Sequence, residues 1–287
     1  MRIAVLSGKG GTGKTFCAVN LASVNSGSIY ADCDIEEPDG HLFFKPQENH
    51  TEDIKVFLPK INHDLCDGCR ACIKFCRFGA LGYVNHKVIV FEDVCHSCGG
   101  CEVVCPRHAI SETSRKIGVV EDGVSEGVRI ISGILEPGME SGVPIIKRIN
   151  EITSKSDGLV IIDCPPGSSC SAIESIKNAD YCLLIAEPTI FGAHDLAMVH
   201  EMIRISGKPC GVVLNKITSG PDPSANYCLD HQIPIIGRIP YDPLLGRIIS
   251  EARIAVREDL VYHVLFEEIL EHILLEVSHE TTANPKR

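Results

Sequence analysis

Short, almost uninterrupted runs of apolar residues recur along the chain, at about 2–7, 28–33, 158–163, 181–186, 210–214 and 234–239. Segments with a helical pattern lie between them, near 14–25, 193–206 and 243–253. A strand that is covered on both faces is apolar throughout, whereas a strand with one wet face alternates. The pattern therefore predicts an α/β fold with a mostly parallel sheet flanked by helices.

Three other segments are predicted from local patterns. Between Leu81 and Phe91, apolar and polar residues alternate around Asn85-His86, which predicts a β-hairpin that turns at those two residues. The tail from about Ser278 is expected to be disordered. A final helix is expected at about 258–277, and its predicted buried face consists of Val261, Val264, Leu265, Ile269, Ile273 and Val277.

The composition limits where the protein can act. A chain of 287 residues is long enough for one sizeable α/β domain and a small second one. The net charge of −11 argues against a nucleic-acid partner. No run of 18 apolar residues occurs, and the first residues have the pattern of a buried strand rather than of a signal peptide. The final helix should pack on the core rather than act as a membrane anchor, because anionic lipid would repel Glu267, Glu268, Glu271 and Glu276.

A glycine-rich loop, Gly8-Lys9-Gly10-Gly11-Thr12-Gly13-Lys14-Thr15, joins the first predicted strand to the first predicted helix. This order of strand, loop and helix is what a phosphate-binding P-loop requires. The backbone N–H groups from Gly8 to Gly13 are expected to close on the phosphates of ATP or ADP. Lys14 should reach the β- and γ-phosphates, and Thr15 should bind Mg²⁺ through its hydroxyl.

The second lysine of this loop, Lys9, is the mark of the deviant Walker ATPases, which include MinD, Mrp-type proteins and the nitrogenase iron protein. The chain resembles this MinD superfamily along nearly its whole length. The resemblance implies that Lys9 reaches the nucleotide of a partner subunit, so that ATP lies between two identical or paralogous chains. A lysine that is only a solvated loop charge is the alternative.

Two acidic segments resemble the switches of these ATPases. In Asp32-Cys33-Asp34, the resemblance implies that Asp34 orients the attacking water, although an aspartate pair after a strand can also be a helix cap or turn. In Asp163-Cys164-Pro165-Pro166-Gly167, it implies that Asp163 holds Mg²⁺ and that the N–H of Gly167 binds the γ-phosphate.

Two further positions match the part of the family site that holds the base. Asn215 ends a predicted strand where the relatives contact adenine, which is a weak signal because asparagine is common at strand ends. Pro240 lies in a segment, Ile239-Pro240-Tyr241, that resembles the base-flanking loop of the family and supports the assignment.

Eight of the 15 cysteines form two copies of one pattern, Cys66-x2-Cys69-x2-Cys72-x3-Cys76 and Cys95-x2-Cys98-x2-Cys101-x3-Cys105. Thiolates at this spacing hold iron–sulfur clusters. Structural zinc is the alternative, but it usually takes pairs of cysteines separated by a longer loop. With eight cysteines as ligands and the others mostly in apolar segments, the pattern indicates a reducing compartment, and we expect a cytoplasmic protein.

Over roughly residues 60–120 the chain resembles the bacterial two-cluster ferredoxins. Pro106 follows the last cysteine as in that family, whereas Arg77 stands where a second proline is common. The resemblance implies two [4Fe–4S] clusters, in which the fourth cysteine of each run binds the other cluster. We expect a small α+β ferredoxin domain at 59–117, inserted into an ATPase domain of 1–58 and 118–287. The implied ligand sets are Cys66, Cys69, Cys72 and Cys105 for one cluster, and Cys95, Cys98, Cys101 and Cys76 for the other.

Cys170 lies in the second switch at the spacing of a cluster ligand of the nitrogenase iron protein, where a bridging cluster needs two cysteines from each subunit. Only Cys164 is nearby as a second ligand. A small loop residue at the dimer face is therefore the expected role of Cys170.

These features predict a slow, partner-stimulated ATPase that dimerises on ATP and couples nucleotide state to electron transfer through its clusters. Charge neutralisation would come from Lys14, Lys9 and Mg²⁺. Its protein partner would be a redox protein or an acceptor of clusters. A cluster-assembly carrier of the Mrp type is the alternative function, and a cell-positioning ATPase is a weaker one.

Overall fold

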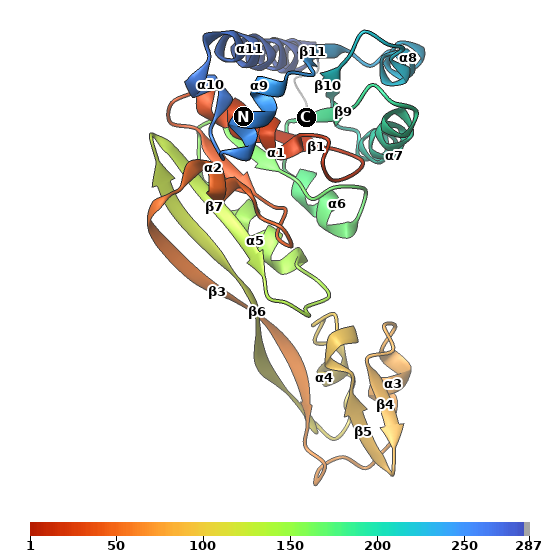
Figure 1. The fold of residues 1–287 in the computed structure, drawn as a ribbon. Coiled ribbons are helices and arrows are strands. Elements are labelled where there is room, and N and C mark those ends of the chain that lie inside the picture. The colour runs from red at the N-terminus through yellow and green to blue at the C-terminus, as the bar shows by residue number, and fades with distance from the viewer. Residues whose placement is uncertain (284–287) are drawn as a thin grey trace.

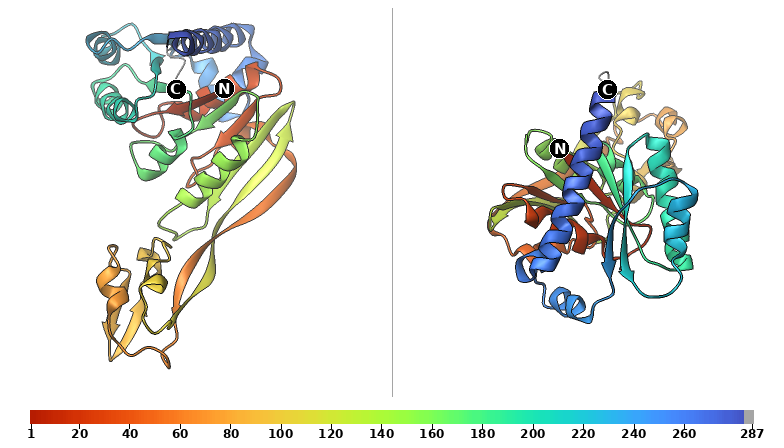
Figure 2. Two further views of the ribbon diagram at one scale, coloured as in Figure 1. Left: turned by 180° about the vertical axis from the view of Figure 1, so that it is seen from behind. Right: turned by 90° about the horizontal axis from the view of Figure 1, so that it is seen from above.

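The structure, a computed structural model, describes residues 1–283, without the side chains of 48, 49 and 279–283. It consists of a large body built on a central sheet and a small unit of residues 62–109 (Figure 1). A long two-stranded ribbon joins them and carries the small unit at its far end, as the reverse view also shows (Figure 2, left).

The body contains one sheet with the strand order β11-β10-β9-β1-β8-β2-β7-β6-β3. Neighbouring strands are parallel except for β7 with β6 and β6 with β3, so the predicted α/β fold with a mostly parallel sheet is confirmed. The strands β3, β6 and β7 at one edge were not predicted. The strand bounds are β1 (Arg2–Leu6), β2 (Ile29–Asp32), β3 (Gln47–Ile61), β6 (Ile110–Ser125), β7 (Val128–Leu135), β8 (Val160–Asp163), β9 (Tyr181–Ala186), β10 (Cys210–Ile217) and β11 (Ile235–Pro240).

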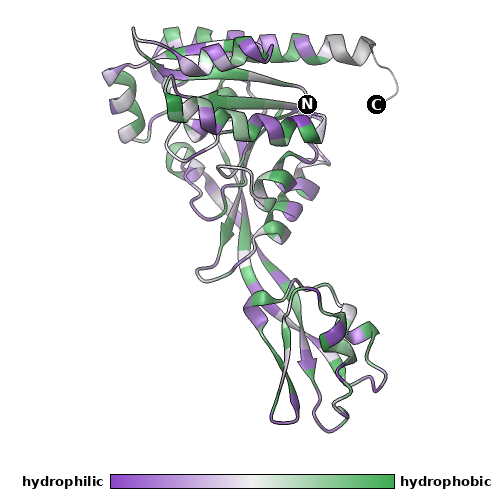
Figure 3. Cartoon of the chain, turned by 90° about the vertical axis from the view of Figure 1, so that its right-hand side faces the viewer, coloured by the Kyte–Doolittle hydropathy of each residue, from purple (hydrophilic) through white to green (hydrophobic). Residues whose placement is uncertain are grey.

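Helices cover both faces of this sheet, and the central strands between them are largely hydrophobic (Figure 3). One face carries α5 (Val143–Thr153), α6 (Cys170–Ile176), α7 (Ile190–Ser206) and α8 (Pro223–Asp230). The other carries α1 (Lys14–Val24), α2 (Gly40–Phe44), α9 (Pro243–Ser250), α10 (Ala255–Glu258) and α11 (Leu260–Ala283). None of the described helices is long and apolar enough to cross a membrane.

The last helix packs on the core through most of the predicted face, because Ile269 and Ile273 are buried and Leu265 and Val277 pack against the core, but two predicted positions are wrong. Tyr262, Phe266 and Ile273 are buried, whereas Val261 is 71 % exposed and Val264 is 43 % exposed. The ring of Phe266 meets that of Phe16 edge-on, with the centroids 5.6 Å apart. An aromatic ring buries more apolar area than a valine, so these aromatic side chains decide which way the helix faces.

The predicted disordered tail is also wrong in part, because α11 continues to Ala283. No proline interrupts the chain between Ser278 and Ala283, and Pro285 is the first residue there that cannot continue a helix. Residues 284–287 of the expected tail lie outside the described part of the chain.

The small unit is held together by a hairpin and a few apolar contacts. The hairpin of β4 (Leu81–Val84) and β5 (Lys87–Val90) turns at Asn85 and His86, as predicted. Leu81, Val88 and Ile110 form its core together with cysteine side chains. The remaining elements are α3 (Ala71–Phe75), a 3-10 turn (Glu92–Val94) and α4 (Gly100–Val103).

The ribbon of β3 and β6 belongs to both parts of the molecule. Its strands pair antiparallel from Gln47–Val124 to Ile61–Ile110. Ile54 and Ile117 pack in the core of the body, while Ile61 and Ile110 pack in the small unit. The expected domain boundaries at 58/59 and 117/118 therefore fall inside continuous strands.

Candidate nucleotide site and cysteine cavities

The P-loop lies at the carboxyl end of β1, directly before α1, which is where phosphate sites occur in parallel sheets. Its close packing requires glycine. Gly13 has a φ of 94°, and a Cβ atom at this position would lie 2.2 Å from Nδ2 of Asn215. Residue 13 therefore has neither the backbone conformation nor the space for a side chain.

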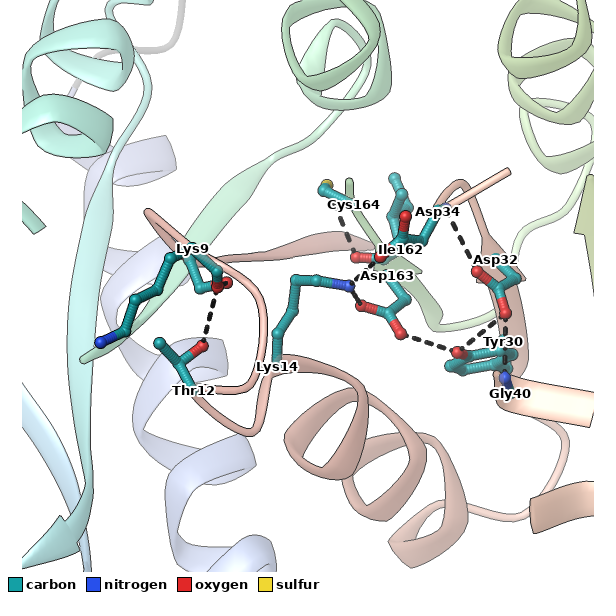
Figure 4. A network of polar contacts seen from close by, with 11 residues as sticks. Lys9, Thr12, Lys14, Tyr30, Asp32, Asp34, Gly40, Ile162, Asp163 and Cys164 are labelled. Carbon is teal, nitrogen blue, oxygen red and sulfur yellow. Dashed lines mark hydrogen bonds and ion pairs between the residues drawn. The ribbon is translucent and has the colours of Figure 1, made fainter. Parts of the chain in front are cut away.

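Lys14 reaches from the P-loop to the two switch aspartates predicted from the sequence. Its Nζ atom lies 2.5 Å from Oδ1 of Asp163 and 3.2 Å from Oδ2 of Asp34 (Figure 4). Burial alone would lower the pKa of Lys14, but Asp163 and Asp34 outweigh it and raise that pKa above its ordinary value. Burial raises the pKa of Asp34, and Lys14 offsets this only in part. The structure thus brings Lys14, Asp34 and Asp163 together as one charged group.

A second layer behind these residues was not found from the sequence. The hydroxyl of Tyr30 donates to Oδ2 of Asp163 over 2.8 Å, and it also lies 3.4 Å from Oδ2 of Asp32. Asp32 accepts from the backbone N–H groups of Asp34 and Gly40. Burial and the nearby Asp163 raise the pKa of Asp32 well above its usual range. This network fixes both ends of the first switch and holds Asp163 in place.

Lys9 points to the other side of the P-loop from Lys14 (Figure 4). Its Nζ atom lies 3.2 Å from Oε2 of Glu187, the residue that follows β9. Lys216 lies 2.7 Å from the other oxygen of Glu187 and also donates to the backbone carbonyl of Gly11 over 2.7 Å. Burial alone would raise the pKa of Glu187, but Lys216 and Lys9 more than offset it and lower that pKa.

Other predicted residues support the loop in this structure. Nδ2 of Asn215, a buried side chain, donates to the carbonyl of Thr12 over 2.7 Å. The N–H of Gly167 donates to the carbonyl of Ser7 over 2.9 Å. Gly8 packs so tightly on α7 that a Cβ atom there would lie 2.4 Å from Asp195.

A cavity of about 1260 Å³ opens over the P-loop; we call it the nucleotide cavity. Gly10, Gly11, Lys14 and Thr15 line it on the phosphate side. Asn215 and Pro240, which the sequence assigns to the base, also line it. Asp163 and Thr12 are buried beneath this surface. The small unit also reaches the nucleotide cavity, through Cys95, His96 and Ser97.

Comparison with known proteins identifies the family of this fold and loop. Residues 3–255 match the family described as the CobQ/CobB/MinD/ParA nucleotide-binding domain. The chain belongs to this family. It is 34 % identical over 255 residues to an uncharacterised protein of Methanocaldococcus jannaschii, covering 87 % of this chain and 88 % of the relative. A second uncharacterised protein of the same organism is 28 % identical over 225 residues, or 75 % of this chain and 80 % of the relative.

Solved structures of similar fold include MinD proteins of cell division. MinD of Pyrococcus horikoshii with Mg-ADP superposes with a TM-score of 0.60 at 17 % identity, over 95 % of each chain. MinD of Pyrococcus furiosus gives 0.60 at 19 % identity, over 95 % of this chain and 97 % of that one. The MinC:MinD complex of Aquifex aeolicus gives 0.57 at 14 % identity, over 95 % of each. These likenesses show that the MinD/ParA family member described here has the fold of MinD.

The eight patterned cysteines gather around two separate cavities of the small unit. One, which we call the far cavity, is lined by Cys66, Cys69, Cys72 and Cys105. The other, the near cavity, is lined by Cys76, Cys95, Cys98 and Cys101. Each cavity thus receives three cysteines of one run and the fourth cysteine of the other.

The cysteines of one cavity influence one another electrostatically. Burial raises the pKa of Cys72, and the neighbouring Cys105 and Cys66 raise it further. Burial likewise raises the pKa of Cys101, with Cys95 and Cys98 adding to it. Within the described part of the chain, no three His, Cys, Asp or Glu side chains are grouped closely enough to hold a single metal ion.

The two extra switch cysteines lie in different environments. Cys170 is exposed at the start of α6 and lines the nucleotide cavity. Cys164 is completely buried, and its Sγ atom lies 3.7 Å from the carbonyl of Ile162. Because Cys164 does not reach the surface, it is not a second ligand for a bridging cluster at a dimer face. The sequence had left it as the only nearby cysteine for that role.

Sequence reasoning missed Tyr30, Glu187 and Lys216. Glu187 could have been found, because it is a carboxylate directly after a buried strand, at the same edge of the sheet as the P-loop. Tyr30 lies inside an apolar strand, and nothing in its local sequence reveals that its hydroxyl reaches Asp163.

Proposed function

We propose that the chain is an ATP-hydrolysing iron–sulfur protein that dimerises on ATP and couples nucleotide state to electron transfer through two [4Fe–4S] clusters. The observation that carries this proposal is the pair of four-cysteine cavities on a unit that reaches the nucleotide cavity of a MinD/ParA-type ATPase. Membership of a nucleotide-binding family supports ATP as the ligand, and the two sets of four cysteines support redox-active clusters.

The cysteine cavities suit clusters better than single zinc ions. In a [4Fe–4S] cluster each cysteine binds a different iron atom, so the four sulfur atoms stay further apart than around one ion. The side chains line two cavities in sets of four without forming a mononuclear site among the described residues, which fits that requirement. Bound there, the clusters would supply one-electron transfer. Residues 59–117 would then act as the ferredoxin domain.

When a nucleotide binds, the ammonium group of Lys14 would leave the carboxylates of Asp163 and Asp34 and contact phosphate oxygens instead. Asp163 would then be free to hold Mg²⁺ together with Thr15, and Asp34 would be free to orient the attacking water. The metal would neutralise charge on the phosphates. The Mg-ADP in the similar MinD of Pyrococcus horikoshii supports a magnesium nucleotide as the ligand. Asn215 and Pro240, which also line this cavity, would flank the base.

Lys9 would act on the nucleotide of a second chain. It extends away from Lys14 and is 41 % exposed, on a loop at the surface of the nucleotide cavity. A lysine in that position suits contact with another subunit better than contact with its own nucleotide. The second subunit would be an identical or paralogous chain.

The variant Lys9→Ala tests this role. We expect it to abolish ATP hydrolysis and ATP-dependent dimerisation, measured by phosphate release and by analytical ultracentrifugation. Lys177→Ala removes an exposed lysine that pairs with Glu174 away from the nucleotide cavity, and it should behave like the wild type. A monomeric, fully active Lys9→Ala variant would show that the lysine has no role in trans.

Iron and sulfide analysis of anaerobically purified protein tests the clusters. We expect about eight iron atoms per chain, the content of two [4Fe–4S] clusters. Cys69→Ala and Cys98→Ala change exposed cysteines of different cavities, so each should remove about half of the iron. A protein that binds zinc and no iron would refute the redox part of the proposal.

A carrier of clusters is the second candidate function. The exposure of Cys69 and Cys98 favours it, because each cavity has one cysteine that an acceptor protein can reach. Incubation with an apo-ferredoxin separates the two functions. Efficient transfer of iron and sulfide to the acceptor supports a carrier, and retention of both clusters supports electron transfer.

A further inference from the structure

One loop of the small unit separates the near cavity from the nucleotide cavity. Cys95, His96 and Ser97 line both cavities, so the residues 92–97, which we call the 92–97 loop, form their common wall. Of the cysteines that line the far cavity, none lines the nucleotide cavity. The near cavity therefore shares a wall with the nucleotide cavity, whereas the cysteines of the far cavity do not border it.

The 92–97 loop is braced from both sides. The ring of His96 stacks on Phe78, with the centroids 3.9 Å apart, and Phe78 lines the near cavity. On the other side, Arg115 of β6 lies 3.1 Å from Asp93 and 3.5 Å from Glu92. Arg115 itself lines the nucleotide cavity. A change of charge or shape in the nucleotide cavity should therefore act on the 92–97 loop, which contains Cys95, a cysteine of the near cavity.

The nucleotide cavity is large and is lined by residues of both the body and the small unit. Its volume of about 1260 Å³ exceeds the roughly 300–1,000 Å³ typical of a small-molecule site. In salt solution the field of a charge falls off over a Debye length, roughly 8–10 Å at physiological ionic strength, so it acts mainly on groups that border the same cavity. The negative charge of a γ-phosphate should therefore be felt at the near cavity and much less at the far cavity.

Resting on the function proposed above, we propose that the 92–97 loop makes the near cluster (ligands Cys76, Cys95, Cys98 and Cys101) the nucleotide-responsive one. Exchange of ADP for ATP lowers the reduction potential of the near cluster, because added negative charge disfavours the reduced form. The far cluster (ligands Cys66, Cys69, Cys72 and Cys105) keeps its potential.

The test is a redox titration of the holoprotein followed by electron paramagnetic resonance, with Mg-ADP and then with a non-hydrolysable Mg-ATP analogue. Two arginine variants assign the signals. Arg115→Gln removes a positive charge beside the near cavity, and Arg107→Gln removes one that lines the far cavity. Each should lower the potential of its own cluster.

The expected result is that the ATP analogue lowers the potential of the cluster assigned by Arg115→Gln and leaves the other unchanged. A tenfold change in the ratio of oxidised to reduced cluster corresponds to about 59 mV for one electron. His96→Ala removes the stacked ring and should reduce this nucleotide-dependent shift at least by half. His63→Ala, an exposed histidine near the far-cavity cysteines in the sequence, is the matched control and should leave the shift intact.

Iron content and binding of the ATP analogue are measured on the same samples. If either is missing, the proposed function itself fails. If both are present, the inference is overturned by equal shifts of the two clusters, by no shift in either, by a shift of the far cluster alone, or by a full shift in His96→Ala.

Discussion

The ammonium group of Lys9 lies 3.2 Å from a carboxylate oxygen of Glu187 in its own chain, on the side of the P-loop away from Lys14. Lys216 binds the same carboxylate and the carbonyl of Gly11. The lysine that we propose to act on a partner's nucleotide is therefore held on its own subunit. Dimerisation on ATP must break or rearrange this contact.

Glu187→Gln should strengthen ATP-dependent dimerisation, because in this variant Lys9 does not have to break an ion pair with Glu187 before it contacts the other subunit. Exposed ion pairs contribute about 0.2–1 kcal/mol, so the expected gain in dimer affinity is at most about fivefold for each Lys9 that is released, or about 30-fold where two identical subunits each release one. Sedimentation at several protein concentrations with ATP measures it. Glu174→Gln breaks a remote exposed pair with Lys177 and serves as the control. A weakened dimer would instead mean that Glu187 holds Lys9 in place across the interface.

Tyr30→Phe should destabilise the first switch and its link to Asp163. The lost hydroxyl leaves Oδ2 of Asp163, a buried carboxylate oxygen, without its donor, which should cost about 1–3 kcal/mol in the free energy of unfolding. Oδ2 of Asp32 still accepts from the N–H of Gly40. Urea denaturation of the holoprotein under anaerobic conditions measures this cost. Tyr227→Phe loses a hydroxyl contact with His200 that is only partly buried, and it should cost less. Equal effects would argue against a special role for Tyr30.

Local sequence patterns were enough to predict the P-loop with its flanking strand and the hairpin of the small unit. The strand before Gly8, the position of Lys14 and the hairpin turn at Asn85 each depend on residues close together in sequence. The sets of cysteines around the two cavities also agree with those implied by the ferredoxin pattern. By contrast, β3 pairs with residues about 60 positions later, and its exposed face carries charges such as Asp53 and Lys55, so no continuous apolar run marked it.

The contacts behind the site were beyond sequence reasoning for a similar reason. Tyr30 and Asp163 meet because β2 and β8 are neighbours in the sheet, and strand order is not written in either segment. Lys9 and Glu187 meet because β9 ends beside the P-loop. Two positions of the predicted α11 face, Val261 and Val264, were misjudged because apolar residues lie around much of that helix, so its periodicity did not single out Phe266 over Val261.

Asn215→Ala should loosen the P-loop. The buried amide connects the carbonyl of Thr12 to the backbone N–H of Lys216, over 2.7 Å and 2.9 Å. Its loss leaves both backbone groups without this partner and should cost about 1–3 kcal/mol in the free energy of unfolding. ATP affinity should fall with it, measured by calorimetry. Asn226→Ala removes an exposed asparagine on α8 and should change neither quantity. Unchanged stability in Asn215→Ala would contradict the role of this bridge.

Cysteine alkylation should distinguish the switch cysteines and report on nucleotide state. Because the thiolate is the reactive form, burial protects a cysteine both by blocking access and by raising its pKa. Burial raises the pKa of Cys164, which is 0 % exposed, whereas Cys170 is exposed beside the nucleotide cavity. In the holoprotein, iodoacetamide at pH 8 should therefore label Cys170 first and Cys164 only after unfolding, as read by mass spectrometry of peptides.

The same experiment has a pH dependence and a nucleotide dependence. Burial, with a further contribution from Glu276, raises the pKa of Cys210 to about 11, so its labelling should increase about tenfold for each pH unit between 8 and 10. ATP should slow the labelling of Cys170, because the second switch would close and face the partner subunit, whereas ADP should not. Cys210 lies on β10, away from that switch, and provides the internal control. Labelling of Cys170 that is equally fast with ATP and ADP would show that the start of α6 stays open in both states, and the proposed dimer face would then have to exclude it.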